Sequence, residues 1–252
     1  MELNRTQYEK IQDCFPKQRK PAKISNLEVL NAVLYVVENG CKWRRLPKEY
    51  GDWHVIYVRV NRWAKKGVLQ DAFVRLQQQG IIQIQVNVVS LDSTCIKVHP
   101  DGMGALKKGG PQSVGRTRGG WNTKLHMVAA SDRDGVMFAL SAGNCGDAPE
   151  GRTLLRRLGP IDRSVYLLMD RAYEGDETRA LAAELGYIPV VPPKSNRKNP
   201  WDYDKQLYKQ RNQVERLFRR LKRFRRIFTR YDKLDIVFLA FLYFALVVDA
   251  LM

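Results

Sequence analysis

The sequence has few of the residues that build zinc or disulfide sites. Its 252 residues include three histidines and four cysteines, and no two of Cys14, Cys41, Cys95 and Cys145 have C-x-x-C spacing. A zinc site is therefore not expected. The N-terminus does not resemble a signal peptide, because the first apolar run comes late and is broken by charge. These absences predict a cytoplasmic protein with reduced thiols.

The chain also lacks an apolar run long enough to cross a bilayer. The most apolar stretch, IVFLAFLYFALVV, covers residues 236–248 and ends at Asp249. A membrane span needs roughly 18–20 residues of this kind. We therefore predict that this segment is a buried closing helix, and that the protein has no membrane partner.

Acidic residues are scarce relative to basic ones. Asp and Glu number 26 against 43 Lys and Arg, which gives a net charge of +17 and a pI near 9.9. Such a balance favours a polyanionic partner, nucleic acid first and an anionic membrane surface second. Residues 194–230 contain 14 cations and 3 acids, a net charge of +11. Most of the excess positive charge is therefore expected on one local surface.

The N-terminal third of the chain predicts helices. Ser25 and Glu28 form a capping box before LEVLNAVLYVV, and Gly40 ends that pattern. Asp52 is placed to cap the second helix, and LQDAFVRLQQQ predicts a third. Three short helices are compatible with a helix-turn-helix unit that contacts DNA. A small helical bundle that serves only as a scaffold explains the pattern equally well.

After Gly80 the apolar residues follow the period of strands. VNVVSLDST predicts a first strand, and DRDG between TKLHMVAAS and VMFALSAGN predicts a hairpin. Residues 101–120 are rich in glycine and lysine, and they predict a mobile loop between the first strand and this hairpin. Two later strands, SVYLLMD and YIPVVPP, alternate with helices, and Asp147 with Glu150 predicts a capping box for the first of these helices. The order predicts an α/β fold with a mixed sheet flanked by helices.

Two aspartates stand where apolar strands meet their loops. Asp92 follows VNVVSL and Asp170 follows VYLLM. Functional sites in α/β sheets gather at such strand ends, and the two carboxylates come close together if the strands are parallel neighbours. Adjacent carboxylates repel, and a divalent cation with oxygen ligands, Mg²⁺ or Mn²⁺, removes that conflict. Either aspartate taken alone is more simply explained as a turn cap.

A third acid, Glu215, is surrounded by six cations within YKQRNQVERLFRRLK, residues 208–222. At 100° per residue, one face of this helix is apolar and is expected to face the core: Leu207, Val214, Leu217, Phe218, Leu221 and Phe228. A second, narrow stripe beside it contains Tyr208, Arg211, Glu215 and Lys222.

Two explanations of Glu215 remain open from the residues alone. Arg211 and Arg219 each lie four residues from it, so weak surface ion pairs are one explanation. The other is that Glu215 binds a metal cation while the arginines hold an anion. Trp201 and Tyr203, just before this helix, could stack on a base, although core packing is the simpler interpretation.

These motifs resemble those of bacterial insertion-sequence transposases of the DDE type. The second stripe spells Y-x2-R-x3-E-x6-K, the signature of one large group of them. The segments SLDST, RTRGGWNTKLH, MDRAY and PPKSNRK are similar to the insertion-sequence-five group within it, and the resemblance covers essentially the whole chain. One departure is visible, because Gly146-Asp147 stands where a His-Asp pair is expected.

The resemblance implies an RNase H-like catalytic domain at residues 83–252, behind a small all-helical domain at residues 1–82. It identifies Asp92, Asp170 and Glu215 with a metal-binding catalytic triad that holds Mg²⁺ or Mn²⁺, as two ions. It also implies that the following residues lie near DNA: Tyr208, Arg211, Lys222, Arg116, Arg118, Lys194 and Arg197. For the arginines before Trp121, a flexible linker is a nearly equal alternative.

The implied activity is cleavage of double-stranded DNA at the terminal inverted repeats of an element, followed by strand transfer into target DNA. Two ions about 4 Å apart suit such in-line displacements, and the chain shows no Ser or Cys constellation for a covalent intermediate. Synapsis of two ends implies a homodimer or larger on DNA, at the bacterial nucleoid. Two alternatives stay open: an inactive DNA-binding regulator, and a nuclease of the same fold without strand transfer.

Overall fold

The computed structural model describes residues 1–17, 23–104 and 110–252, and it divides into two compact units. We call them the helical unit (Met1–Ile82, Val98–Gln112 and Leu221–Met252) and the sheet unit (Gln83–Lys97 and Ser113–Arg220). The sequence-based division assigned all of residues 83–252 to the second domain. In the structure, residues 98–104, 110–112 and 221–252 group with the N-terminal helices instead.

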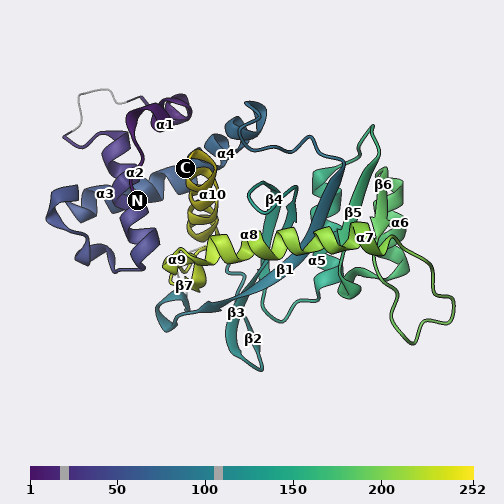
Figure 1. The fold of residues 1–252 in the computed structure, drawn as a ribbon. Helices are drawn as coiled ribbons and strands as arrows, with labels where there is room; N and C mark the ends of the chain where they lie inside the picture. Colours follow the sequence, from purple (N-terminus) through teal and green to yellow (C-terminus); the bar gives the residue numbers. More distant parts are fainter. Residues whose placement is uncertain (18–22, 105–109) are drawn as a thin grey trace. The chain divides into compact units, whose positions relative to one another are not determined.

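The helical unit is built from amphipathic helices around one closing helix. Its main elements are α1 (Arg5–Glu9), α2 (Asn26–Asn39), α3 (Trp53–Lys65), α4 (Val68–Gln78), α9 (Arg225–Phe228), the short β7 (Thr229–Arg230) and α10 (Asp235–Leu251) (Figure 1). The predicted caps of α2 are confirmed. Ser25 and Glu28 form the capping box, and Gly40 ends the helix with a φ of 64°, a conformation that glycine adopts without strain.

The predicted closing helix is confirmed as α10, which packs against α3 and α4 and is buried along most of its length. Two buried ion pairs lie in the segment that leads into α10 and at its first residue. Arg230, with a fully buried side chain, donates to Asp235 Oδ1 at 2.8 Å, and Arg226 donates to Asp232 Oδ1 at 2.9 Å. Within the described ranges, no helix combines the length and apolarity that a bilayer span requires.

The sheet unit confirms the predicted mixed sheet flanked by helices. Its elements are β1 (Val88–Val98), β2 (Gly115–Thr117), β3 (Gly120–Ala129), β4 (Gly135–Ala142), α5 (Asp147–Leu158), β5 (Val165–Met169), α6 (Asp176–Glu184), β6 (Tyr187–Val190), α7 (Lys205–Tyr208) and α8 (Asn212–Lys222), whose last two residues enter the helical unit. The strand order is β2-β3-β1-β5-β6, with β4 also paired to β3. Because β3 and β4 are antiparallel to their neighbours while β1, β5 and β6 run parallel, the sheet is RNase H-like.

The two faces of β1 carry different chemistry. Leu91 belongs to the apolar cluster that α5 and α6 cover on one face. Successive side chains on a strand point to opposite faces, so Asp92 points to the other face, the one that α8 crosses (Figure 1). Ser93 returns to the face of α5, where it bonds to Asp147. The alternation of side chains along β1 therefore places Asp92 on one face of the sheet and Ser93, with its partner Asp147, on the other.

Three local expectations were wrong. Residues 101–120 contain a short strand, β2, where a continuous loop was predicted; part of that stretch, 105–109, lies outside the described residues. The strand β1 continues well beyond Asp92 instead of ending there. Phe228, predicted to face the core, is 59% exposed because α8 ends at Lys222 and a new helix, α9, begins at Arg225.

Candidate active site

Asp92 and Asp170 lie next to each other at one point of the sheet. The strands β1 and β5 are parallel neighbours, which is the arrangement that brings the two carboxylates close together. Their register pairs Leu91 with Met169. The residues that follow this pair are Asp92 and Asp170, on strands that neighbour each other at about 4.8 Å. Asp170 also accepts a hydrogen bond from the Ala172 N–H, so its carboxylate fixes the turn after β5.

A single guanidinium connects Asp92 to Glu215. Arg211 donates from Nη1 to Asp92 Oδ2 at 2.7 Å and from Nη2 to Glu215 Oε1 at 2.5 Å. Both bonds are charge-assisted, and such bonds are short and strong. The surface-pair explanation of Glu215 thus holds for Arg211, but the same arginine reaches a second acid that is distant in sequence. The guanidinium brings one positive charge to these carboxylates.

Burial dominates the electrostatics of Asp92. It is the main cause that raises the pKa of Asp92 to about 6, and the neighbouring carboxylates of Asp170 and Glu215 act in the same direction. The Ser93 N–H and the Arg211 guanidinium act in the opposite direction. Because burial and like charges both disfavour the ionised form, a bound cation would stabilise this group of acids.

The other residues of the signature lie on different elements. Tyr208 ends α7, and the ring is 5.9 Å from the Arg211 guanidinium; burial raises the pKa of its hydroxyl. A 3₁₀ turn at Lys209–Arg211 separates α7 from α8, so the stripe is not on one continuous helix as the sequence suggested. Lys222 is the last residue of α8 and belongs to the helical unit.

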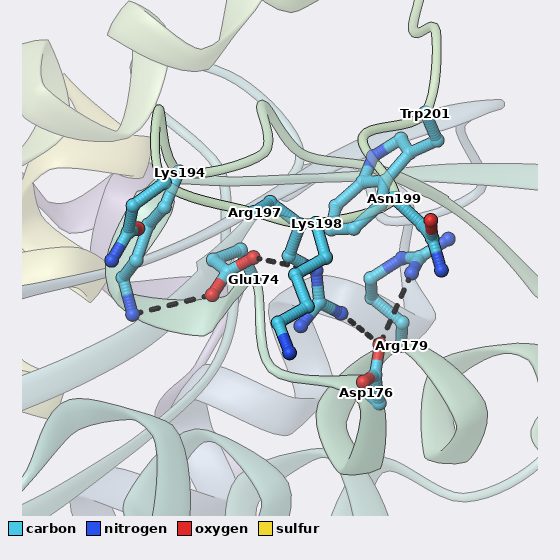
Figure 2. A pocket seen from close by; sticks show the side chains of 9 residues that line it. Glu174, Asp176, Arg179, Lys194, Arg197, Lys198, Asn199 and Trp201 are labelled. Carbon is cyan, nitrogen blue, oxygen red and sulfur yellow. Dashed lines mark hydrogen bonds and ion pairs between the residues drawn. The ribbon is translucent and has the colours of Figure 1, made fainter.

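The predicted DNA-contacting residues fall in two places. Arg116 and Arg118 are exposed, in β2 and in the turn that follows it. Lys194 and Arg197 line a separate pocket of about 550 Å³, beside the start of α6. Figure 2 shows both side chains directed at the buried Glu174, at 3.2 Å and 3.5 Å, and Arg197 also paired with Asp176.

Trp201 in the same pocket has a structural role. Its indole N–H donates to the Val191 carbonyl at 2.9 Å, and the Arg179 guanidinium lies 3.5 Å from the ring centroid. The tryptophan also packs against the apolar cluster of the sheet unit. A cation over the ring face is a favourable cation–π contact. These contacts favour the core-packing interpretation over base stacking.

The capping box predicted at Asp147 and Glu150 is wrong. The cap position is Gly146, and no side chain caps this helix end. The Asp147 carboxylate instead accepts hydrogen bonds from Ser93 Oγ at 2.7 Å and Lys124 Nζ at 3.0 Å. Sequence reasoning missed Ser93 and Lys124 as neighbours of the site, because these contacts join residues far apart in sequence and no spacing rule connects them.

The family models match most of the chain. Residues 86–248, more than half of it, match the model "Transposase DDE domain", and residues 3–73 match "Putative transposase of IS4/5 family". The chain belongs to the DDE transposase family. Together, the two models cover the predicted N-terminal helices and the segments that contain Asp92, Asp170 and Glu215.

Two curated relatives each match nearly half of this DDE transposase. The chain is 32% identical over 124 residues to the "Putative transposase for insertion sequence element IS6501" of Brucella ovis, covering 49% of this chain and 93% of the relative. It is 30% identical over 112 residues to protein y4sN of Sinorhizobium fredii, covering 43% and 86%.

Two solved structures match the chain with low similarity. The piggyBac transposase synaptic complex with hairpin DNA is 9% identical with a TM-score of 0.42, over 76% of this chain and 47% of that one. This transposase thus spans about half the length of that chain. The Mos1 transposase paired-end complex with left transposon end is 12% identical with a TM-score of 0.28, over 85% and 81%.

The donor set of the site fits a divalent cation. Among the residues that the structure describes, no three His, Cys, Asp or Glu side chains are already gathered as a metal site. Arg211 holds Asp92 and Glu215 by the oxygen atoms that a cation would bind. Three carboxylates are hard oxygen ligands of the kind that Mg²⁺ and Mn²⁺ prefer.

Proposed function

We propose that this DDE transposase catalyses divalent-cation-dependent cleavage of DNA ends and strand transfer of an insertion sequence. Asp92, Asp170 and Glu215 are the proposed catalytic and metal-binding residues. The observation that carries the proposal is that Arg211 bonds to both Asp92 and Glu215. Asp170 supports it, because Asp92 and Asp170 follow paired residues of two neighbouring parallel strands. The family match supports the same chemistry.

In this proposal the acids bind the metal ions, and Arg211 and Tyr208 position the DNA phosphate. The three carboxylates would hold Mg²⁺ or Mn²⁺, and two such ions supply activation of the attacking hydroxyl and stabilisation of the leaving oxygen in an in-line displacement. Arg211, once released from an acid, offers a planar pair of donors that suits a DNA phosphate. Tyr208, half-buried beside it, limits where that phosphate can lie.

The proposed partner is double-stranded DNA, at the terminal repeats of the element and at the target. The exposed Arg116 and Arg118 project from the β2–β3 hairpin, and the net charge of +17 favours a polyanion. Lys194 and Arg197 are further candidates, although in the structure both are paired with acids. Holding two ends at once implies a homodimer or larger on DNA.

A strand-transfer reaction with the full chain, labelled end DNA and Mg²⁺ tests the proposal. A transposase gives cleaved ends and products joined to target DNA. Nicks without joined products would indicate a nuclease of the same fold, and binding without any cleavage would indicate an inactive regulator. Omitting the divalent ion must remove both products.

The two hairpin arginines are expected to act through phosphate charge. Replacing both Arg116 and Arg118 by alanine should weaken binding to all duplex sequences alike. It should lower the slope of log Kd against log salt by about 1.8, since each neutralised phosphate contributes roughly 0.9. Fluorescence anisotropy with end DNA and scrambled DNA at several salt concentrations measures this. An unchanged slope would show that this hairpin makes no phosphate contacts.

Arg211 is expected to compete with the divalent ion for the acids. Arg211→Gln should bind Mn²⁺ more tightly, by roughly tenfold, because removing a positive charge a few ångströms away is worth about 1–4 kcal/mol. Strand transfer should nevertheless fall. Titration calorimetry of the DNA-free protein measures the affinity, and the control is Arg216→Gln, which changes an exposed arginine of α8. Weaker Mn²⁺ binding by Arg211→Gln would contradict the competition.

A further inference from the structure

The helix α3 has one buried face and one open face, and the two differ in chemistry. Ile56, Val60, Trp63 and Ala64 are buried where α3 packs within the helical unit, against α2, α4 and α10. On the opposite face, five side chains are exposed or half-buried and recur at helical spacing: His54, Val58, Asn61, Arg62 and Lys65. None of these five residues is an acid. We call them the open face of α3.

The positive charge of the N-terminal part of the chain is concentrated around α3. Residues 42–66, which include α3 and the turns before it, contain 8 cations and 2 acids, a net charge of +6. Residues 1–41 and 67–82 together contain 7 cations and 6 acids, a net charge of +1. One of the two acids near α3, Asp52, is its N-cap and accepts two backbone N–H groups. The charge of this surface therefore favours a polyanionic partner.

Cations stand at both ends of α3. Arg44 and Arg45 are exposed in the turn before the helix, and the Arg44 guanidinium lies 5.5 Å from the ring centroid of Trp53, the first residue of α3. Lys65 and Lys66 are exposed at the other end. A 13-residue helix is about 20 Å long, and the major groove of B-DNA is about 12 Å wide. A helix of this length that is seated in the groove reaches the phosphates on either side.

Asn61 and Arg62 lie side by side on the open face, and both are residue types that recognise bases directly. Asparagine pairs with adenine and arginine with guanine, each through two hydrogen bonds. The Asn61 amide donates to the Tyr57 carbonyl at 2.9 Å, which leaves a second N–H and the amide oxygen for a base. Arg62 is exposed, whereas the half-buried Arg59 donates to the Ile24 carbonyl at 2.7 Å and serves the fold.

We propose that α3 recognises the sequence of end DNA from the major groove, with Asn61 and Arg62 contacting base edges and the cations at the two ends of the helix contacting phosphates. The inference rests on the proposed function and adds to it the helix that recognises the element's ends. Phosphate contacts position a protein on a duplex, and base contacts provide the specificity. A helical bundle that serves only as a scaffold would give the open face no such preference for sequence.

The test is binding of the full chain, without a divalent ion, to end DNA and to a duplex of the same bases in scrambled order. Fluorescence anisotropy measures both affinities, and their ratio is the preference for end DNA. For Asn61→Ala/Arg62→Ala this preference should fall by about tenfold or more, because each bidentate base contact supplies discrimination of that order. Affinity for scrambled DNA should fall much less, since one charge is removed. A preference within about twofold of wild type would overturn the inference, and so would an equal loss for both duplexes.

A second variant, Arg62→Lys, keeps the charge but removes the planar pair of donors. It should lower the preference for end DNA while leaving the affinity for scrambled DNA unchanged. An unchanged preference would overturn the role of Arg62 in base contact.

The matched control removes the same kinds of side chain elsewhere in the helical unit. Arg5→Ala/Gln78→Ala changes an exposed arginine of α1 and an exposed amide at the end of α4. It should keep the wild-type preference for end DNA, and all the variants should melt near the wild-type temperature because none of the changes touches a buried side chain. An equal loss of preference in this control would overturn the assignment to α3.

A failure of this inference is separable from a failure of the proposed function. If wild type prefers end DNA and Asn61→Ala/Arg62→Ala keeps that preference, another surface recognises the ends, and the proposed strand transfer stands. If wild type cleaves and joins no DNA while its preference for end DNA depends on Asn61 and Arg62, the catalytic proposal fails and the role of α3 holds. No preference in wild type would overturn the inference together with the proposed recognition of the ends.

Discussion

Strand transfer by Asp92→Asn is expected to fall by at least about 1,000-fold, with DNA binding unchanged. The substitution keeps the size and one oxygen of the side chain but removes its charge, and metal-assisted stabilisation of a phosphoryl transition state is worth several kcal/mol. Asp92 follows Leu91, whose register partner Met169 precedes Asp170, and its carboxylate bonds to Arg211. Joined products from labelled end DNA, measured with Mg²⁺ and with Mn²⁺, give the rate.

The control for Asp92→Asn is the same change at Asp162, an exposed aspartate of the sheet unit for which we propose no role. Asp162→Asn should transfer strands at the wild-type rate. End DNA binding, measured by mobility shift without divalent ion, should be the same in all three proteins. Joining by purified Asp92→Asn at a rate near that of wild type would remove this residue from the catalytic triad.

The largest loss of stability is expected from Asp235→Ala in the helical unit. Its carboxylate accepts a hydrogen bond at 2.8 Å from Arg230, whose side chain is fully buried. Breaking a buried ion pair by removing one partner typically costs about 3–5 kcal/mol, because the remaining charge keeps its desolvation penalty. The free energy of unfolding, measured by urea denaturation followed by circular dichroism, should fall by that amount.

A surface pair in the same unit provides the contrast. Arg5 and Glu9 form an i,i+4 ion pair with side chains that are 88% and 49% exposed. Glu9→Ala should cost less than about 1 kcal/mol, as exposed pairs usually do. Equal losses from the two substitutions would show that burial does not govern the strength of these pairs.

Local signals in the sequence predicted much of the fold. Ser25 with Glu28 specified the start of α2, and the apolar strands before Asp92 and Asp170 indicated where the two acids meet. Each of these features depends on a few consecutive residues or on the side-chain period of a strand. The order of strands and helices then limited the sheet to a few arrangements.

The missed features depend on contacts between distant segments. The hydrogen bonds of Asp147 to Ser93 and Lys124 compete with its use as a helix cap, and only the assembled sheet decides between them. The 3₁₀ turn at Lys209–Arg211 breaks the helical wheel, and it is at this turn that Arg211 reaches Asp92. A helical pattern assumes regular geometry and so cannot show such a break.

The burial of Tyr173 could not be predicted for the same reason. Its motif, MDRAY, shows only that a tyrosine follows Asp170 by three residues. In the structure the ring is fully buried and packs closely against Gly151 of α5, which is distant in sequence.

The most direct measurement is an anomalous difference map from crystals of the full chain soaked in Mn²⁺. We predict density at the meeting point of β1, β5 and α8, within about 2.0–2.6 Å of carboxylate oxygens from Asp92, Asp170 and Glu215, with the Arg211 guanidinium displaced from at least one of them. Manganese bound elsewhere, or no manganese at these three acids at saturating concentration, would contradict the shared metal site.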